Sequence, residues 1–141
     1  MTKRQSYFWL GIFAFGTIEF TAVQDNIRPN YRGQSSLIIY LLGIAPNYFA
    51  GLGLSSFFVV MITHINSTSK QPSSSVWLNS KAQLSGIAIS VFGLSLWEFM
   101  QTFSAHGFFD WNDLAWTVLG VLTFYLIWCV INRKIITAAK R

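Results

Sequence analysis

Two short polar motifs stand at the facing ends of two strongly apolar segments, and their residue types suit acid–base or binding chemistry. Glu98 and Gln101 lie one helical turn apart near the end of the first segment. Asp113, Thr117 and Gly120 fall on one helical face at the start of the next. Carboxyl groups placed in this way can accept or donate a proton, or hold a divalent ion that bridges to a phosphate headgroup.

Apolar helices must position these motifs. The chain has 141 residues, of which 52% are hydrophobic and 11% are charged, against roughly 25% charged in a soluble domain. A helix needs about 20 mostly apolar residues to cross the hydrocarbon core of a bilayer. The sequence therefore predicts an all-α membrane protein, one domain over residues 1–141 that forms a compact bundle of four transmembrane helices. The expected spans are about Tyr7–Val23, Leu37–His64, Leu84–Phe103 and Leu114–Ile131.

Proline interrupts the second span. Pro46 removes a backbone donor and clashes with the preceding turn, so we expect the helix to be kinked or broken there. Asn47, Gly51 and Ser55 follow at four-residue steps, which predicts a face for close helix packing. Asn47 is the exception on this face, because its amide can satisfy freed backbone groups or serve a ligand.

Basic residues predict the orientation, because Lys and Arg in short loops stay on the cytoplasmic side. With both termini cytoplasmic, eight basic residues lie inside and two, Arg28 and Arg32, lie outside. The first span is expected to be retained, since no small-x-small cleavage site follows it. The predicted location is the plasma membrane, which the chain crosses several times. The inside set is Lys3, Arg4, Lys70, Lys81, Arg133, Lys134, Lys140 and Arg141.

This orientation gathers polar residues from distant parts of the chain on the exterior side. Ionisable groups in or beside a span usually mark a site or an internal pairing. For catalysis the candidates are Glu98, Asp113 and His106, the last as a base near Ser104 or simply as a solvated loop residue. The candidate ligand-binding residues are Glu19, Arg28, Arg32, Asn47, Glu98, Gln101, Asp110, Asp113 and Thr117.

A purely structural interpretation remains open for the same residues. Asp110 and Asp113 have the position of helix-capping residues. Glu98 would then pair with Arg28 or Arg32, and Gln101 would tie its helix to a neighbouring backbone. The two arginines could instead hold a lipid phosphate or another anion.

The first span also carries an acid. Glu19 lies close to the exterior end of the span and would either reach the lipid headgroups or face the bundle interior.

Other function classes find little support. The basic residues form no stripe, which argues against nucleic-acid binding. Cys129 has no second thiol for a disulfide or a metal pair, and His64 has no companion ligand at metal-binding spacing. No hydrolase, metalloprotease or phosphate-loop motif is present, so enzymatic activity is unsupported by motifs. We expect no cofactor and no bound metal.

The spacing of Glu98, Gln101, Asp113 and Gly120 resembles the VanZ-like family of small bacterial membrane proteins. Thr117 stands where the family usually has Asn, no Arg lies between Glu98 and Asp113, and a weaker echo is found at residues 45–51. The resemblance implies a role in the cell envelope, such as low-level resistance to glycopeptides of the teicoplanin type.

Three functions are consistent with these patterns. In the first, an exterior pocket binds an amphiphile or a lipid-linked headgroup. In the second, an enzyme acts on a lipid or polyprenyl headgroup through Glu98 and Asp113. In the third, the protein is a structural subunit of a membrane complex. The partners expected are membrane lipids, an amphiphilic ligand, and a membrane protein or further copies of the chain.

Overall fold

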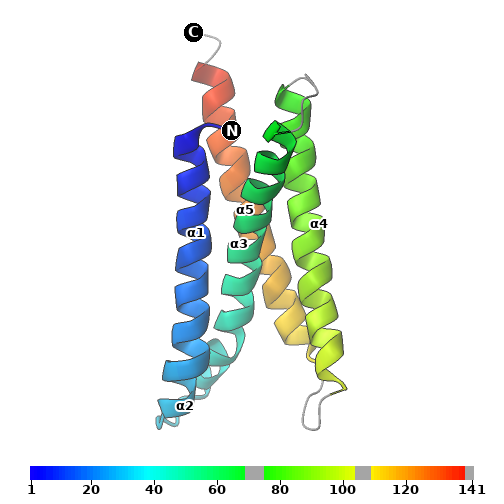
Figure 1. Ribbon diagram of the computed structural model, residues 1–141. Coiled ribbons are helices and arrows are strands. Elements are labelled where there is room, and N and C mark those ends of the chain that lie inside the picture. Colours follow the sequence, from blue (N-terminus) through cyan, green and yellow to red (C-terminus); the bar gives the residue numbers. More distant parts are fainter. Residues whose placement is uncertain (69–74, 104–108, 139–141) are drawn as a thin grey trace.

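The apolar stretches form long helices, which a computed structural model arranges as a bundle (Figure 1). It describes residues 1–68, 75–103 and 109–138; of residues 68, 75–81 and 132–138 it describes only the backbone. Four helices in this part of the chain are long and apolar enough to cross a membrane. The elements are α1 (Lys3–Thr21), the π-helical η1 (Ala22–Ile27), α2 (Arg28–Asn30), α3 (Ser36–Thr68), α4 (Ser75–Gln101) and α5 (Trp111–Ala138).

The first helix extends beyond its expected end at Val23. A π-helical turn continues it, with the Arg28 N–H bonded to the carbonyl of Val23, and helical structure persists to Asn30. The Asn30 side chain donates to the carbonyl of Asn26 at 2.7 Å. It thereby satisfies a backbone acceptor near Pro29, whose own nitrogen has no hydrogen to donate. Arg28 therefore lies on a helix, where the sequence indicated a loop.

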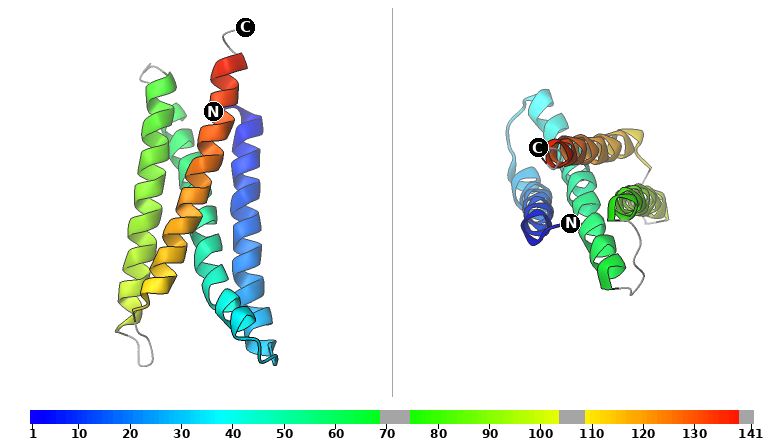
Figure 2. Two further views of the ribbon diagram at one scale, coloured as in Figure 1. Left: turned by 180° about the vertical axis from the view of Figure 1, so that it is seen from behind. Right: turned by 90° about the horizontal axis from the view of Figure 1, so that it is seen from above.

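The central helix of the bundle is α3, which packs on α1, α4 and α5. Seen from above, it passes between α1 and α4 (Figure 2). Pro46 lies inside α3 and does not interrupt it. The first part of α3 leans away from the direction of the rest (Figure 2), so the helix bends and is not broken. Its other end runs to Thr68, which makes the connection to α4 shorter than the sequence indicated.

Small residues let α3 and α5 approach closely. A Cβ atom added to Gly51 would collide with the backbone carbonyl of Thr117, and one added to Gly120 would collide with the carbonyl of Tyr48. Ser55, one turn beyond Gly51, is fully buried. The packing face predicted from the four-residue spacing is confirmed, and it meets α5.

The other two contacts of α3 also depend on glycine. A Cβ on Gly16 of α1 would lie 2.9 Å from the carbonyl oxygen of Phe49, and a Cβ on Gly86 of α4 would lie 2.7 Å from a Val59 methyl carbon. In the described part of the chain, α1 and α4 do not pack on each other. The space between α1 and α4 therefore has α3 as its floor.

Aromatic side chains join α1 to α5 in the core. The Trp9 ring, only 1% exposed, lies 5.1 Å from the Phe124 ring and 5.3 Å from the Trp128 ring, measured between centroids. Leu52 and Val59 of α3 complete this buried cluster. Aromatic pairs at these separations add to the stabilisation that burial provides.

The two ends of the bundle differ in charge. At one end, where α1 and α4 finish, lie Glu98, Asp110 and Asp113, and we name it the acidic end. At the opposite end, the terminal end, lie the N-terminus and the last turns of α5 (Figure 1). Between the ends, large apolar side chains of every long helix are exposed, such as Phe15, Leu41, Phe92 and Leu126. Such a surface suits lipid, so the fold is that of a multi-pass helical membrane protein.

Candidate functional site

Glu98 is the most deeply buried ionisable residue at the acidic end. Its side chain is 3% exposed, and its Oε1 atom accepts a hydrogen bond from Gln101 Nε2 at 3.0 Å. Its second oxygen, Oε2, is buried and has no hydrogen-bond partner among the described residues. Glu98 therefore has Gln101, one helical turn away, as its hydrogen-bond partner, and this bond satisfies only one of the two carboxyl oxygens.

Asp110 and Asp113 bring two further carboxyl groups to Glu98. Both lie near enough for their charges to act on Glu98, and Asp110 acts on Asp113 as well. Asp110 Oδ1 accepts from the backbone N–H of Asn112 at 2.8 Å, and the Asp110 carbonyl accepts from Leu114 at 3.3 Å. Asp110 thus has the capping role predicted for it, while Asp113 lies within the first turn of α5.

Asn47 connects α3 to this cluster. Its amide lies close enough to the Asp113 carboxyl group to interact with it. Because Asn47 follows Pro46 directly, it lies where α3 bends toward the start of α5. We use the name acidic cluster for Glu98, Asp110 and Asp113, with Asn47 as the amide that contacts it.

The arginines do not neutralise the acidic cluster by direct contact. Arg28 is exposed and donates to Gln24 Oε1 at 3.4 Å, while its charge acts on Asp113 from a longer distance. Arg32 is exposed as well. Within the described residues, neither arginine makes an ion pair with Glu98. The predicted alternative in which Glu98 pairs with Arg28 or Arg32 is wrong for this structure, because both guanidinium groups remain on the surface.

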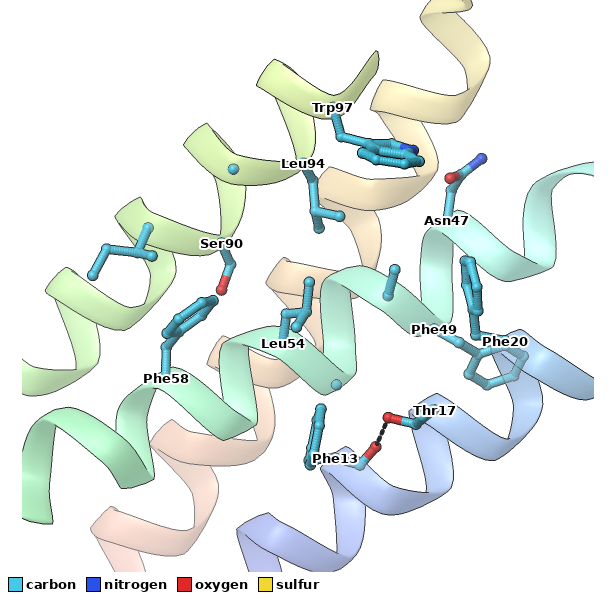
Figure 3. Close-up of a pocket in the computed structure, with 15 residues that line it drawn as sticks. Phe13, Thr17, Phe20, Asn47, Phe49, Leu54, Phe58, Ser90, Leu94 and Trp97 are labelled. Atoms are coloured by element: carbon cyan, nitrogen blue, oxygen red, sulfur yellow. Dashed lines mark hydrogen bonds between the residues drawn. The ribbon is translucent and has the colours of Figure 1, made fainter. Parts of the chain in front are cut away.

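An apolar groove lies beside the acidic cluster. It occupies the space between α1 and α4, has a volume of about 450 Å³, and is floored by α3. Figure 3 shows Asn47 and Trp97 toward one end of it, with Phe13 and Phe58 toward the other. The lining consists of Phe13, Gly16, Thr17, Phe20, Asn47, Phe49, Ala50, Gly53, Leu54, Phe58, Ile89, Ser90, Gly93, Leu94 and Trp97.

The groove was not predicted from the sequence. Gly86, Ser90 and Gly93 suggest one packing stripe, yet of its two glycines only Gly86 is pressed against α3. Ser90 and Gly93 line the groove, and a Cβ on Gly93 would meet nothing within 4 Å. A stripe of small residues is the available signal, but it does not distinguish a packed face from a groove wall.

Several predicted residues have other positions. Thr117 is 1% exposed and its carbonyl lies against Gly51, so it belongs to the α3–α5 contact. Glu19 is partly buried, and it neither lines the groove nor acts on the acidic cluster. His106 and Ser104 lie outside the described residues. Within the described ranges, no three His, Cys, Asp or Glu side chains are grouped so that they could hold a metal ion.

The geometry combines an apolar groove with a polar end. Asn47 lines the groove and also contacts Asp113, and Trp97 lines the groove directly before Glu98 in sequence. An elongated molecule with an apolar chain and a polar head matches this arrangement. Neither a protein-family model, nor a curated protein, nor a solved structure matches this chain.

Proposed function

We propose that this protein binds an amphiphile in the membrane, with the apolar chain in the groove between α1 and α4 and the headgroup against the acidic cluster. The observation that carries the proposal is the position of Asn47, which lines the groove and touches Asp113. One ligand could therefore contact both regions at once.

The size and lining of the groove support an alkyl chain as its occupant. Its volume of about 450 Å³ falls within the range of roughly 300–1,000 Å³ found for small-molecule sites. Phe13, Phe49 and Phe58 offer ring surfaces to such a chain. A chain already in the bilayer gains little from leaving other lipid tails, so selectivity must come from shape and from the headgroup.

The cellular role that we propose follows from charge and resemblance. Lys3 and Arg4 begin α1 at the terminal end, which favours a cytoplasmic terminal end and an exterior acidic end in a bacterial inner membrane. The resemblance to the VanZ-like family then supports a role in envelope properties, including resistance to amphiphilic glycopeptides of the teicoplanin type.

The proposal is tested by blocking the groove. Gly93→Leu adds a side chain where a Cβ meets open space beside the groove, and Gly11→Leu is the matched control, since Gly11 also faces open space but does not line the groove. The protein in bilayer discs is titrated with dodecyl probes that carry an amine, a hydroxyl or a sulfonate group, and its thermal midpoint is measured. Binding to the folded state must raise the midpoint.

We expect at least one probe to raise the midpoint of the wild type and of Gly11→Leu, and to leave Gly93→Leu unchanged. If Gly93→Leu responds as strongly as Gly11→Leu, the chain does not lie in the groove and the proposal fails.

A further inference from the structure

Negative charge dominates the half of the bundle at the acidic end. All five acidic residues of the chain, Glu19, Asp25, Glu98, Asp110 and Asp113, lie toward this end, and of the basic residues that the structure describes only Arg28 and Arg32 lie there. Both of those arginines are exposed. A headgroup that reaches the acidic cluster therefore meets a local excess of carboxyl groups.

A second observation points to a ligand independently of this charge count. Glu98 is 97% removed from solvent, yet its Oε2 atom has no donor among the described residues. Buried polar atoms in native proteins are nearly always hydrogen-bonded, because leaving one unpaired is costly. Oε2 therefore has an unused acceptor position that a donor on a bound molecule would fill.

The neighbours of Glu98 restrict the chemistry of that donor. Asp113 and Asp110 both act on Glu98 with negative charge, so an anionic headgroup would be repelled. A neutral hydroxyl would donate one hydrogen bond but leave the charges uncompensated. A protonated amine has three donors and a positive charge, and its hydrogen bonds to carboxylates are among the strong ones.

We propose that the headgroup recognised here is a protonated amine, whose ammonium group donates to Glu98 Oε2 and is held beside Asp113. This proposal rests on the proposed function, because the groove supplies the site for the attached chain. The shared chemistry belongs both to amine-bearing membrane lipids and to free cationic amphiphiles.

The test compares chain-matched headgroups. Dodecylamine, dodecanol and dodecyl sulfonate are titrated against the full chain in discs of phosphatidylcholine, and the apparent dissociation constants are obtained from the thermal midpoints. We expect the dissociation constant of the amine to be at least about tenfold lower than that of the alcohol, because the amine adds a charge-assisted hydrogen bond. We expect the sulfonate to bind most weakly of the three.

Variants assign the preference to its residues. Glu98→Gln and Asp113→Asn keep the side-chain shape and should each remove most of the difference between amine and alcohol. Asp25→Asn removes an exposed charge at the same end and should keep that difference. An equal loss in Asp25→Asn would mean that surface charge, and not Glu98, attracts the amine, which overturns the inference.

The two proposals fail in different ways. If the alcohol binds as tightly as the amine, and Gly93→Leu weakens both, the groove function stands and the amine inference is wrong. If no probe binds the wild type, the proposed function itself is wrong and the inference falls with it.

A final arm identifies the source of the amine. The titration is repeated in discs that contain phosphatidylethanolamine. Weakened dodecylamine binding would show that a membrane lipid competes for the site, whereas unchanged binding would indicate a free amphiphile as the ligand.

Discussion

At the scale of single residues, the acidic end depends on how each carboxyl group is used. Asp110 caps α5, Asp113 is held by Asn47, and Glu98 is held by Gln101 through one oxygen only. The first two acids therefore help to fix the start of α5 against α3. Glu98 differs from them, since burial of an incompletely paired carboxyl group disfavours the folded state unless a ligand completes it.

Replacing Asp110 tests its structural role. Asp110→Ala removes the side-chain acceptor of the Asn112 N–H, and we expect a loss of about 0.5–2 kcal/mol in the free energy of unfolding. Asp110→Asn retains an acceptor oxygen and should keep most of that stability. The measurement is reversible unfolding in mild detergent. Equal losses in the two variants would show that charge, and not capping, is the contribution of Asp110.

The sequence predicted part of this residue-level arrangement. The cap at Asp110 follows from local spacing, because a side chain at the start of a helix has few backbone donors within reach. The bond between Glu98 and Gln101 was not predicted, although the two residues lie one helical turn apart. The surface position of Arg28 does not follow from spacing. It depends on the π-helical turn Ala22–Ile27, which continues the helix through residues typical of a loop.

At the scale of helices, close approach to α3 determines the shape of the bundle. Gly51 and Gly120 place α5 against one face of α3, and Gly16 and Gly86 place α1 and α4 against others. Because α1 and α4 each pack on α3 and not on each other, the groove remains between them. The groove is thus a consequence of helix placement, and no single residue encodes it.

Enlarging Gly51 tests this contact. Gly51→Ala places a methyl group against the Thr117 carbonyl, which belongs to rigid backbone, and we expect it to lower the free energy of unfolding by about 1–3 kcal/mol. Gly43→Ala in the same helix is the matched control, since its Cβ meets nothing within 4 Å. Unfolding in detergent should show no loss for Gly43→Ala. Tolerance of Gly51→Ala would mean that α3 and α5 lie farther apart than described.

Helix number and helix order were predictable, because runs of apolar residues long enough to cross a bilayer can hardly form anything else. The packing role of Gly51 was also predictable from its four-residue spacing with Ser55. The sequence could not predict which two helices stay apart. The stripe of Gly86, Ser90 and Gly93 would have the same spacing whether it packed against a helix or lined a groove.

At the scale of the whole molecule, an apolar groove between α1 and α4 lies beside a cluster of carboxyl groups. The bundle exposes large apolar side chains over its surface, so in a membrane the proposed amphiphile would reach the groove from within the bilayer without crossing water. In the proposed complex, the head of the ligand would lie near Trp97 and Asn47, and its chain end would lie near Phe13 and Phe58 (Figure 3).

The most direct measurement is contact quenching of Trp97 by a bromine atom carried on dodecylamine, either in the middle of the chain or at the chain end. The contribution of Trp97 is the fluorescence difference between the wild type and Trp97→Phe, measured in bilayer discs. We predict saturable quenching at a low mole fraction of probe, stronger for bromine in the middle of the chain than at its end, and lost in Gly93→Leu. Quenching that never saturates, or that persists in Gly93→Leu, would contradict the proposed groove as the binding site.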